Sequence, residues 1–201
     1  MTRDTIGFLE VAVHGPAHLV GWSDGANVAL MVAMERPDLV EKLVLISSVF
    51  DVSGTVPELL EAAPSLSADD PELEFPRSEY GSISPDGPEH WPVVFEKLKR
   101  MVLTEPTVDP ANLRSITAPT LVVAADDDIV RLEHTIELYR SVPDAQFAIV
   151  PGASHMVPLQ RPGFLSGLVL YFLRNDPTTT LMPIRRRAHG PGQGHAGRPV
   201  S

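Results

Sequence analysis

Apolar and polar positions divide the chain into helices and short buried strands. Ile6, Leu9 and Val13 recur at helical spacing and predict a first helix. The segment 24–36 is apolar on nearly every side, which predicts a buried helix that ends before Pro37. Continuous apolar runs predict four buried strands, at residues 17–22, 43–46, 120–124 and 147–150. Such strands separated by helices are typical of an α/β fold, with a parallel sheet that helices cover on both faces.

The segment between the second and third predicted strands has a different composition, rich in proline and acidic residues. It is much longer than the roughly 15 residues beyond which structureless loops become uncommon. Trp91, Phe95, Leu98 and Val102 lie four, three and four residues apart, which predicts a helix with an apolar stripe. We interpret residues 52–115 as a helical cap inserted over a site, and a loose surface excursion is the alternative.

Composition indicates one globular core at residues 1–177 and a tail that does not pack. The tail, residues 178–201, is rich in glycine, proline and arginine and is expected to be disordered. It carries four arginines and no acid, so the formal charge of −10 leaves a core at −14. A core this acidic is a poor partner for nucleic acid or an anionic membrane, and we expect a small-molecule substrate instead.

The sequence also excludes several kinds of chemistry. It has no cysteine, which excludes disulfides, thiolate metal sites and thiol nucleophiles. His90, His134, His189 and His195 show no two-ligand spacing, and neither a metal nor a cofactor is expected. No apolar run approaches the roughly 20 residues that span a bilayer. The opening residues lack the apolar core of a signal peptide, so we expect a cytoplasmic location.

The most informative motif is Gly-Trp-Ser-Asp-Gly at residues 21–25, between a predicted strand and a predicted buried helix. On such a strained turn the serine hydroxyl stands above the strand end. Both glycines are expected to be needed, because side chains there would collide with neighbouring backbone. We therefore interpret Ser23 as a nucleophile rather than as a helix N-cap. The backbone N–H of Asp24, at the start of the helix, is expected to point to where an oxyanion would form.

A serine nucleophile needs a general base, and the base needs an acid that holds it in place. Three consecutive acids, Asp126, Asp127 and Asp128, follow the third predicted strand, and His155 follows the fourth. These positions, and the order serine, acid, histidine along the chain, fit a Ser-His-Asp triad.

Residues 4–174 resemble the C-terminal two-thirds of an α/β-hydrolase-fold enzyme, in particular the bacterial single-domain hydrolases with a Gly-Trp-Ser-Asp-Gly elbow. The resemblance extends to the strand region at 118–124, the acidic loop after it, and the run Pro-Gly-Ala-Ser-His that ends at His155. It implies that Ser23 is the nucleophile, His155 the general base and Asp128 the acid. Asp51, which follows the preceding strand, is the alternative acid.

Three aromatic residues are candidates for the wall of the substrate pocket: Trp22, Trp91 and Phe95. Trp22 belongs to the elbow motif, and the other two lie on the predicted helix of the cap. Trp91 and Phe95 are therefore also candidates for the core of the cap.

The resemblance also implies a partial fold, because these enzymes place several strands and an oxyanion-forming loop before the elbow strand. We expect that on the order of 60 or more residues of such a fold are absent from this chain. The strand at 17–22 should then form an exposed sheet edge through which the chain can self-associate. One missing oxyanion donor would lower the rate ~10²- to 10³-fold. The triplet His-Gly-Pro at 14–16 resembles an oxyanion loop, but it directly precedes the elbow strand and is interpreted as a helix end.

Two functions of different classes follow from these observations. The first is a serine hydrolase that acts on a small ester-type or related acyl substrate through Ser23, His155 and Asp128. Perhydrolase and C–C bond hydrolase activities are compatible with the same triad. The second is a catalytically inactive remnant of a truncated hydrolase, or a binding protein.

Overall fold

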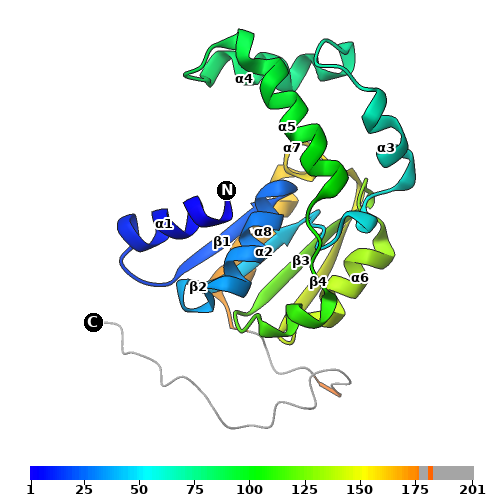
Figure 1. Cartoon of the computed structure of the whole chain (residues 1–201). Coiled ribbons are helices and arrows are strands. Elements are labelled where there is room, and N and C mark those ends of the chain that lie inside the picture. The colour runs from blue at the N-terminus through cyan, green and yellow to red at the C-terminus, as the bar shows by residue number, and fades with distance from the viewer. Residues whose placement is uncertain (177–180, 183–201) are drawn as a thin grey trace.

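The computed structural model describes residues 1–176 and 181–182, and its centre is a parallel β-sheet (Figure 1). The strands lie in the spatial order β1-β2-β3-β4, which is also their order along the chain. Their bounds are β1 Ala17–Trp22, β2 Val40–Ile46, β3 Thr120–Asp127 and β4 Ala145–Ser154. Every neighbouring pair is parallel, so the predicted α/β fold with a parallel sheet is confirmed.

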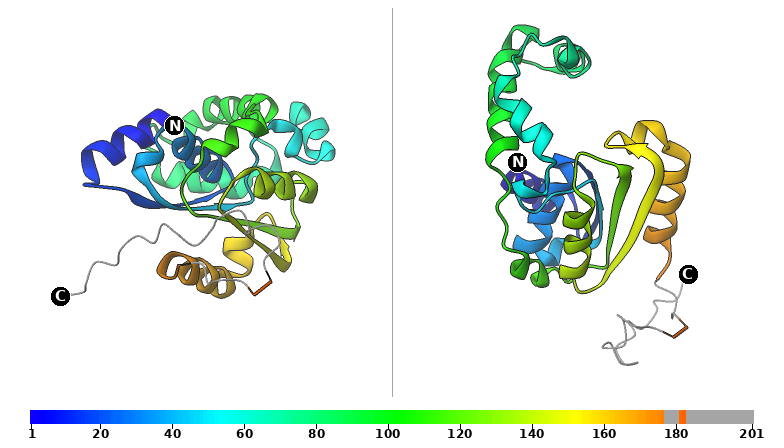
Figure 2. Two further views of the ribbon diagram at one scale, coloured as in Figure 1. Left: turned by 90° about the horizontal axis from the view of Figure 1, so that it is seen from below. Right: turned by 90° about the vertical axis from the view of Figure 1, so that its right-hand side faces the viewer.

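Helices cover both faces of the sheet and extend beyond one of its ends. The α-helices are α1 Thr2–Ala12, α2 Asp24–Glu35, α3 Pro57–Ala62, α4 Glu74–Ile83, α5 Trp91–Thr104, α6 Leu132–Ser141, α7 Val157–Gln160 and α8 Pro162–Arg174. Short 3-10 segments lie at Pro37–Leu39, Val52–Gly54, Ala63–Ser65, Pro71–Leu73, Pro88–His90 and Pro110–Ser115. Figure 2 shows α1, α2 and α6 on one face of the sheet and α7 and α8 on the other.

Alternation along β2 divides the core between these two faces. Leu43 and Leu45 pack in the cluster that contains residues of α1, α2 and α6. Val44 and Ile46 point the opposite way and pack in the cluster that contains residues of α7 and α8. All four side chains are almost completely buried, as a strand covered on both faces requires.

The predicted helix of the proline-rich segment is confirmed as α5. With α3 and α4 it forms a helical insert, residues 47–119 between β2 and β3, whose helices rise beyond the carboxyl ends of the strands (Figures 1 and 2). Trp91 and Phe95 are buried, with ring centroids 5.9 Å apart. The limits 1–177 for the core and 52–115 for the cap stay predictions.

Strand β1 lies at one edge of the sheet and is paired on one side, with β2, within the described residues. Val20 at the middle of this strand is half exposed. The expected edge is therefore present, and self-association through it stays a prediction. The tail at 178–201 falls, apart from Leu181 and Met182, outside the described residues. In the part of the chain that the structure describes, no helix has the length and apolarity needed to cross a bilayer.

Candidate active site

Ser23 occupies a strained turn between β1 and α2. Its φ of 56° and ψ of −127° lie in a region that L-residues rarely adopt, at a cost of roughly 1–3 kcal/mol. The Ser23 N–H donates to the carbonyl of Ile46 at 2.9 Å, which holds the turn against the end of β2. A side chain at Gly21 would place its Cβ 2.4 Å from Ala26 Cα, so this position has no room for one. The strained turn therefore depends on the glycine before it.

The expectation that both elbow glycines avoid collisions is wrong for Gly25. A Cβ built at Gly25 has no atom within 4 Å, because this side of the first turn of α2 is open. The two glycines of the motif therefore differ in their physical roles, and the sequence pattern alone does not distinguish them.

We expect Gly21→Ala to destabilise the fold by about 3 kcal/mol, because the methyl group must displace backbone of α2. The matched variant Gly25→Ala should be neutral or stabilising by about 0.5–1 kcal/mol, since alanine is the better helix former. Guanidinium unfolding of both variants measures the difference. Equal loss of stability in the two variants would contradict this assignment.

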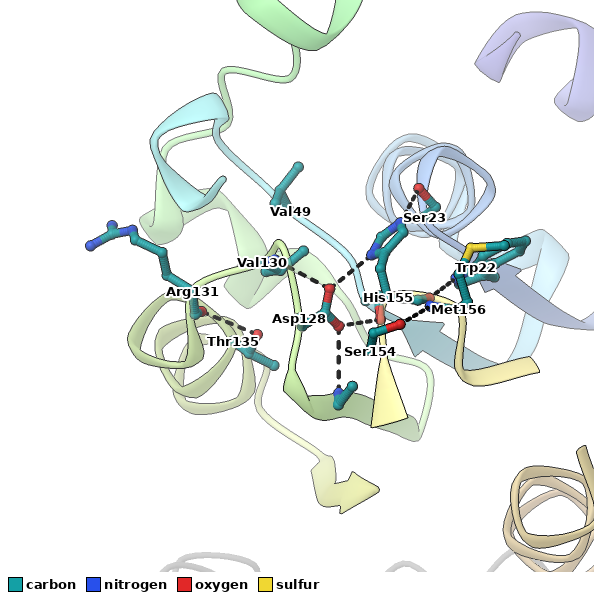
Figure 3. A network of polar contacts seen from close by, with 12 residues as sticks. Trp22, Ser23, Val49, Asp128, Val130, Arg131, Thr135, Ser154, His155 and Met156 are labelled. Carbon is teal, nitrogen blue, oxygen red and sulfur yellow. Dashed lines mark hydrogen bonds and ion pairs between the residues drawn. The ribbon is translucent and has the colours of Figure 1, made fainter. Parts of the chain in front are cut away.

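The structure brings Ser23, His155 and Asp128 into one hydrogen-bonded chain (Figure 3). His155 Nε2 lies 2.9 Å from Ser23 Oγ, and His155 Nδ1 lies 2.8 Å from Asp128 Oδ1. A carboxylate can only accept, so Nδ1 carries the proton and Nε2 presents a lone pair to the serine hydroxyl. This tautomer is the one that a general base requires.

Asp128 is held by further donors besides His155. Its Oδ1 also accepts from the Val130 N–H at 3.2 Å, and its Oδ2 accepts from the Ser47 hydroxyl at 2.5 Å. The Asp128 side chain is 2 % exposed, so burial alone would raise its pKa. Hydrogen bonds from His155 and Ser47 outweigh burial and lower the pKa of Asp128. The carboxylate is therefore ionised at neutral pH and fixed in orientation.

The alternative acid, Asp51, is not brought to His155. Its Oδ1 accepts from the backbone N–H of Ser53 at 3.0 Å and from the Ser53 hydroxyl at 2.5 Å, which caps a short 3-10 segment. These hydrogen bonds lower the pKa of Asp51, with the Ser53 hydroxyl as the main cause. Its position fits a turn-forming residue.

Asp126 is also directed away from His155. Its carboxylate accepts from the backbone N–H groups of Gly152 and Ala153, at 2.9 and 3.1 Å. These two residues lie near the end of β4, shortly before His155. Asp126 thus ties the segment that carries His155 to the end of β3.

Trp22, predicted to line the substrate pocket, instead supports His155. Its indole N–H donates to the backbone carbonyl of His155 at 2.8 Å, and the centroids of the indole and imidazole rings lie 5.8 Å apart. Trp91 and Phe95 belong to the interior of the helical insert, where the Trp91 indole donates to the carbonyl of Ala68 at 2.8 Å. The structure does not place these three aromatic residues on the wall of the cavity that contains Ser23.

Two site residues were missed by the sequence reasoning. Ser47, at the carboxyl end of β2, donates to Asp128, and its φ of 52° is also left-handed. Asn27 in α2 accepts from Ser48 Oγ at 3.0 Å and from the Val49 N–H at 2.9 Å, which ties the elbow helix to the loop after β2. A hydroxyl directly after a buried parallel strand was the available signal for Ser47. No local pattern indicated Asn27.

The cavity at Ser23 measures about 90 Å³ and is lined on one side by the elbow and His155. Its other walls come from the loop after β2, from α3, from the end of α5 and from the loop after β3. Asp24 is the first residue of α2, so its backbone N–H has no acceptor within the helix and can bind an anion. The triplet at 14–16 lies at the opposite end of β1, as expected for a helix end.

Comparisons with known proteins identify the family of this chain. Residues 2–167 match the alpha/beta hydrolase family. The chain is 27 % identical over 197 residues to the mouse sn-1-specific diacylglycerol lipase ABHD11, covering 86 % of this chain and 64 % of the lipase. It is 29 % identical over 196 residues to the 2-hydroxy-6-oxononadienedioate/2-hydroxy-6-oxononatrienedioate hydrolase of Comamonas testosteroni, covering 86 % of this chain and 68 % of that enzyme. The chain thus spans about two thirds of the length of these relatives.

A solved structure gives the same result for the fold. The meta-cleavage product hydrolase of Pseudomonas fluorescens IP01 superposes with a TM-score of 0.67 at 20 % identity, over 86 % of this chain and 70 % of that chain. The family match, the parallel sheet and the relatives support one another, and the chain belongs to the alpha/beta hydrolase family.

Proposed function

We propose that this protein is a serine hydrolase that cleaves an ester-type or related acyl substrate, with Ser23 as nucleophile, His155 as general base and Asp128 as the acid. The observation that carries the proposal is the unbroken hydrogen-bonded chain from Ser23 through His155 to Asp128, at 2.9 and 2.8 Å. Membership of a hydrolase family supports it.

Acylation begins when His155 Nε2 accepts the proton of the Ser23 hydroxyl while Oγ attacks the carbonyl carbon. The carbonyl electron pair moves to oxygen, and the backbone N–H of Asp24 donates to that oxyanion. Collapse of the tetrahedral intermediate breaks the bond to the leaving alkoxide, which takes its proton from His155. The acyl group then remains on Ser23 as an ester.

Deacylation repeats these steps with water as the nucleophile. His155 takes a proton from water, hydroxide attacks the acyl carbon, and Ser23 Oγ leaves with the proton returned by His155. The ionised Asp128 stabilises the imidazolium in both halves of the reaction. Its hydrogen bonds from Ser47 and Val130 keep this carboxylate oriented without further rearrangement.

Labelling with a fluorophosphonate probe tests the proposal, because the probe reacts with an activated serine. The purified full chain is expected to be labelled, and both Ser23→Ala and His155→Ala should abolish the label. Ser154→Ala is the matched control, since Ser154 precedes His155 and bonds to Gln160 instead of the triad. Its label should persist. A cooperative thermal melt without labelling would contradict the proposal and favour the alternative of a catalytically inactive remnant or a binding protein.

A further inference from the structure

A larger cavity adjoins the one that contains the proposed nucleophile. It measures about 460 Å³, and its wall shares Asp24, Asn27 and Glu105 with the 90 Å³ cavity at Ser23 and His155. The rest of the larger wall is mainly apolar, with Val28, Met31, Met101, Pro106 and Val108. An apolar space thus lies next to Asp24 and Glu105, on the wall that the two cavities share.

The charged side chains on the wall that the two cavities share, here called the junction, are both negative. Asp24 and Glu105 line both cavities, and no lysine or arginine side chain lines either of them within the described residues. Neither carboxylate forms an ion pair with a lysine or arginine in the part of the chain that the structure describes. Met1 also lines the larger cavity, and its amino group forms an ion pair with Asp4 at 3.0 Å. The junction is therefore net negative.

Incomplete hydration strengthens the field of Asp24, which is partly buried, whereas Glu105 is exposed to solvent. Burial raises the pKa of Asp24, and the hydrogen bond from Asn27 at 3.4 Å and the interaction with His155 compensate only in part. A carboxylate that has lost water interacts more strongly with a charge brought close to it. An incoming cation would replace part of the lost solvation, whereas an incoming anion would meet repulsion from both carboxylates.

We propose that the site selects its substrate by charge: it prefers an acyl ester whose remote part carries an ammonium group over an equally long ester that carries a carboxylate. Glu105, at the junction of the two cavities, is the specificity-determining residue. This inference rests on the proposed serine hydrolase function and names the substrate class for it. The same electrostatics disfavours substrates with several carboxylates.

The test uses three activated esters with one leaving group and acyl chains of equal length. One chain ends in trimethylammonium, one in its uncharged tert-butyl isostere and one in carboxylate. We expect kcat/KM to fall in that order, with the cationic ester about tenfold or more above the anionic one at low salt. Glu105→Gln should reduce this cation-to-anion ratio about three- to tenfold. The matched control is Glu96→Gln on α5, the helix that ends just before Glu105, because Glu96 pairs with Lys99 at 2.8 Å and lines neither cavity. It should leave the ratio unchanged.

A ratio near one, or a ratio that Glu105→Gln does not change, would overturn the charge proposal. Binding separates this failure from failure of the hydrolase proposal. Calorimetry on the full chain carrying Ser23→Ala compares an alkyltrimethylammonium ion with an alkanoate of equal length. Tighter binding of the cation, weakened by Glu105→Gln, supports charge selection even where no ester is hydrolysed. Equal or tighter binding of the alkanoate contradicts it.

Discussion

Ser23→Ala is expected to lower kcat/KM for ester hydrolysis about 10⁴-fold or more, because the residues of a triad act as one unit. The variant removes one oxygen, and the hydrogen bond of that oxygen within the described residues is the one to His155. No apolar contact of the core is lost. The melting temperature should therefore stay within about 2 °C of the parent value, since no stabilising group of the core is removed. Steady-state kinetics and calorimetry on the same samples measure both effects.

The companion variant Ser23→Gly separates chemistry from backbone strain. It should be as inactive as Ser23→Ala, because it also lacks the hydroxyl. It should be more stable than Ser23→Ala by about 1 kcal/mol, because glycine adopts a positive φ without a steric penalty. Retention of more than about 1 % of the activity in either variant would show that another nucleophile acts.

Asp128→Asn is expected to lower kcat about 10³- to 10⁴-fold with little change in the fold, as loss of the acid does in serine triads. The amide nitrogen would donate to His155 Nδ1, which forces the proton onto Nε2. Nε2 could then no longer accept the proton of Ser23. Progress curves with an activated ester, at a pH near neutrality, measure the loss.

Asp51→Asn is the matched control for Asp128→Asn, because it makes the same chemical change at the other candidate acid. Asp51 bonds to Ser53 and does not contact His155. Its activity should stay within about threefold of the parent, as for a substitution outside the active site. The reverse outcome, an inactive Asp51→Asn variant and an active Asp128→Asn variant, would assign the role of the acid to Asp51.

The hydrogen bond of Ser47 shows how neighbouring strands assemble this site. β2 and β3 are paired in parallel, with Ile46 opposite Val123, so their carboxyl ends lie side by side. The loop after β2 therefore presents Ser47 to the loop after β3, which carries Asp128. A residue 81 positions away in sequence thus orients the acid.

Local pattern was sufficient for the architecture and for the strained turn that carries Ser23, the proposed nucleophile. The continuous apolar runs predicted all four strands, and the helical spacing predicted the helices α1, α2 and α5. A strand buried on both faces leaves an unbroken apolar run, whereas a helix buried along one stripe leaves apolar residues three or four positions apart. The elbow was also recognisable locally, since its strain is confined to a few consecutive residues. His155 and the acidic loop were located by their place after a strand end.

The tertiary structure decided what depends on contacts between distant segments. Asp51 and Asp128 both follow strands, and only the placement of His155 against Asp128 distinguishes them. Gly21 and Gly25 look equivalent in the motif, and only the approach of α2 makes Gly21 indispensable. Glu105 lines the same cavities as Asp24 because the end of the insert returns to the elbow. The sequence by itself determined the elements and the candidate residues, since these follow from local periodicity. Packing across the sheet decided which candidate residues lie together, because long-range contacts set their relative positions.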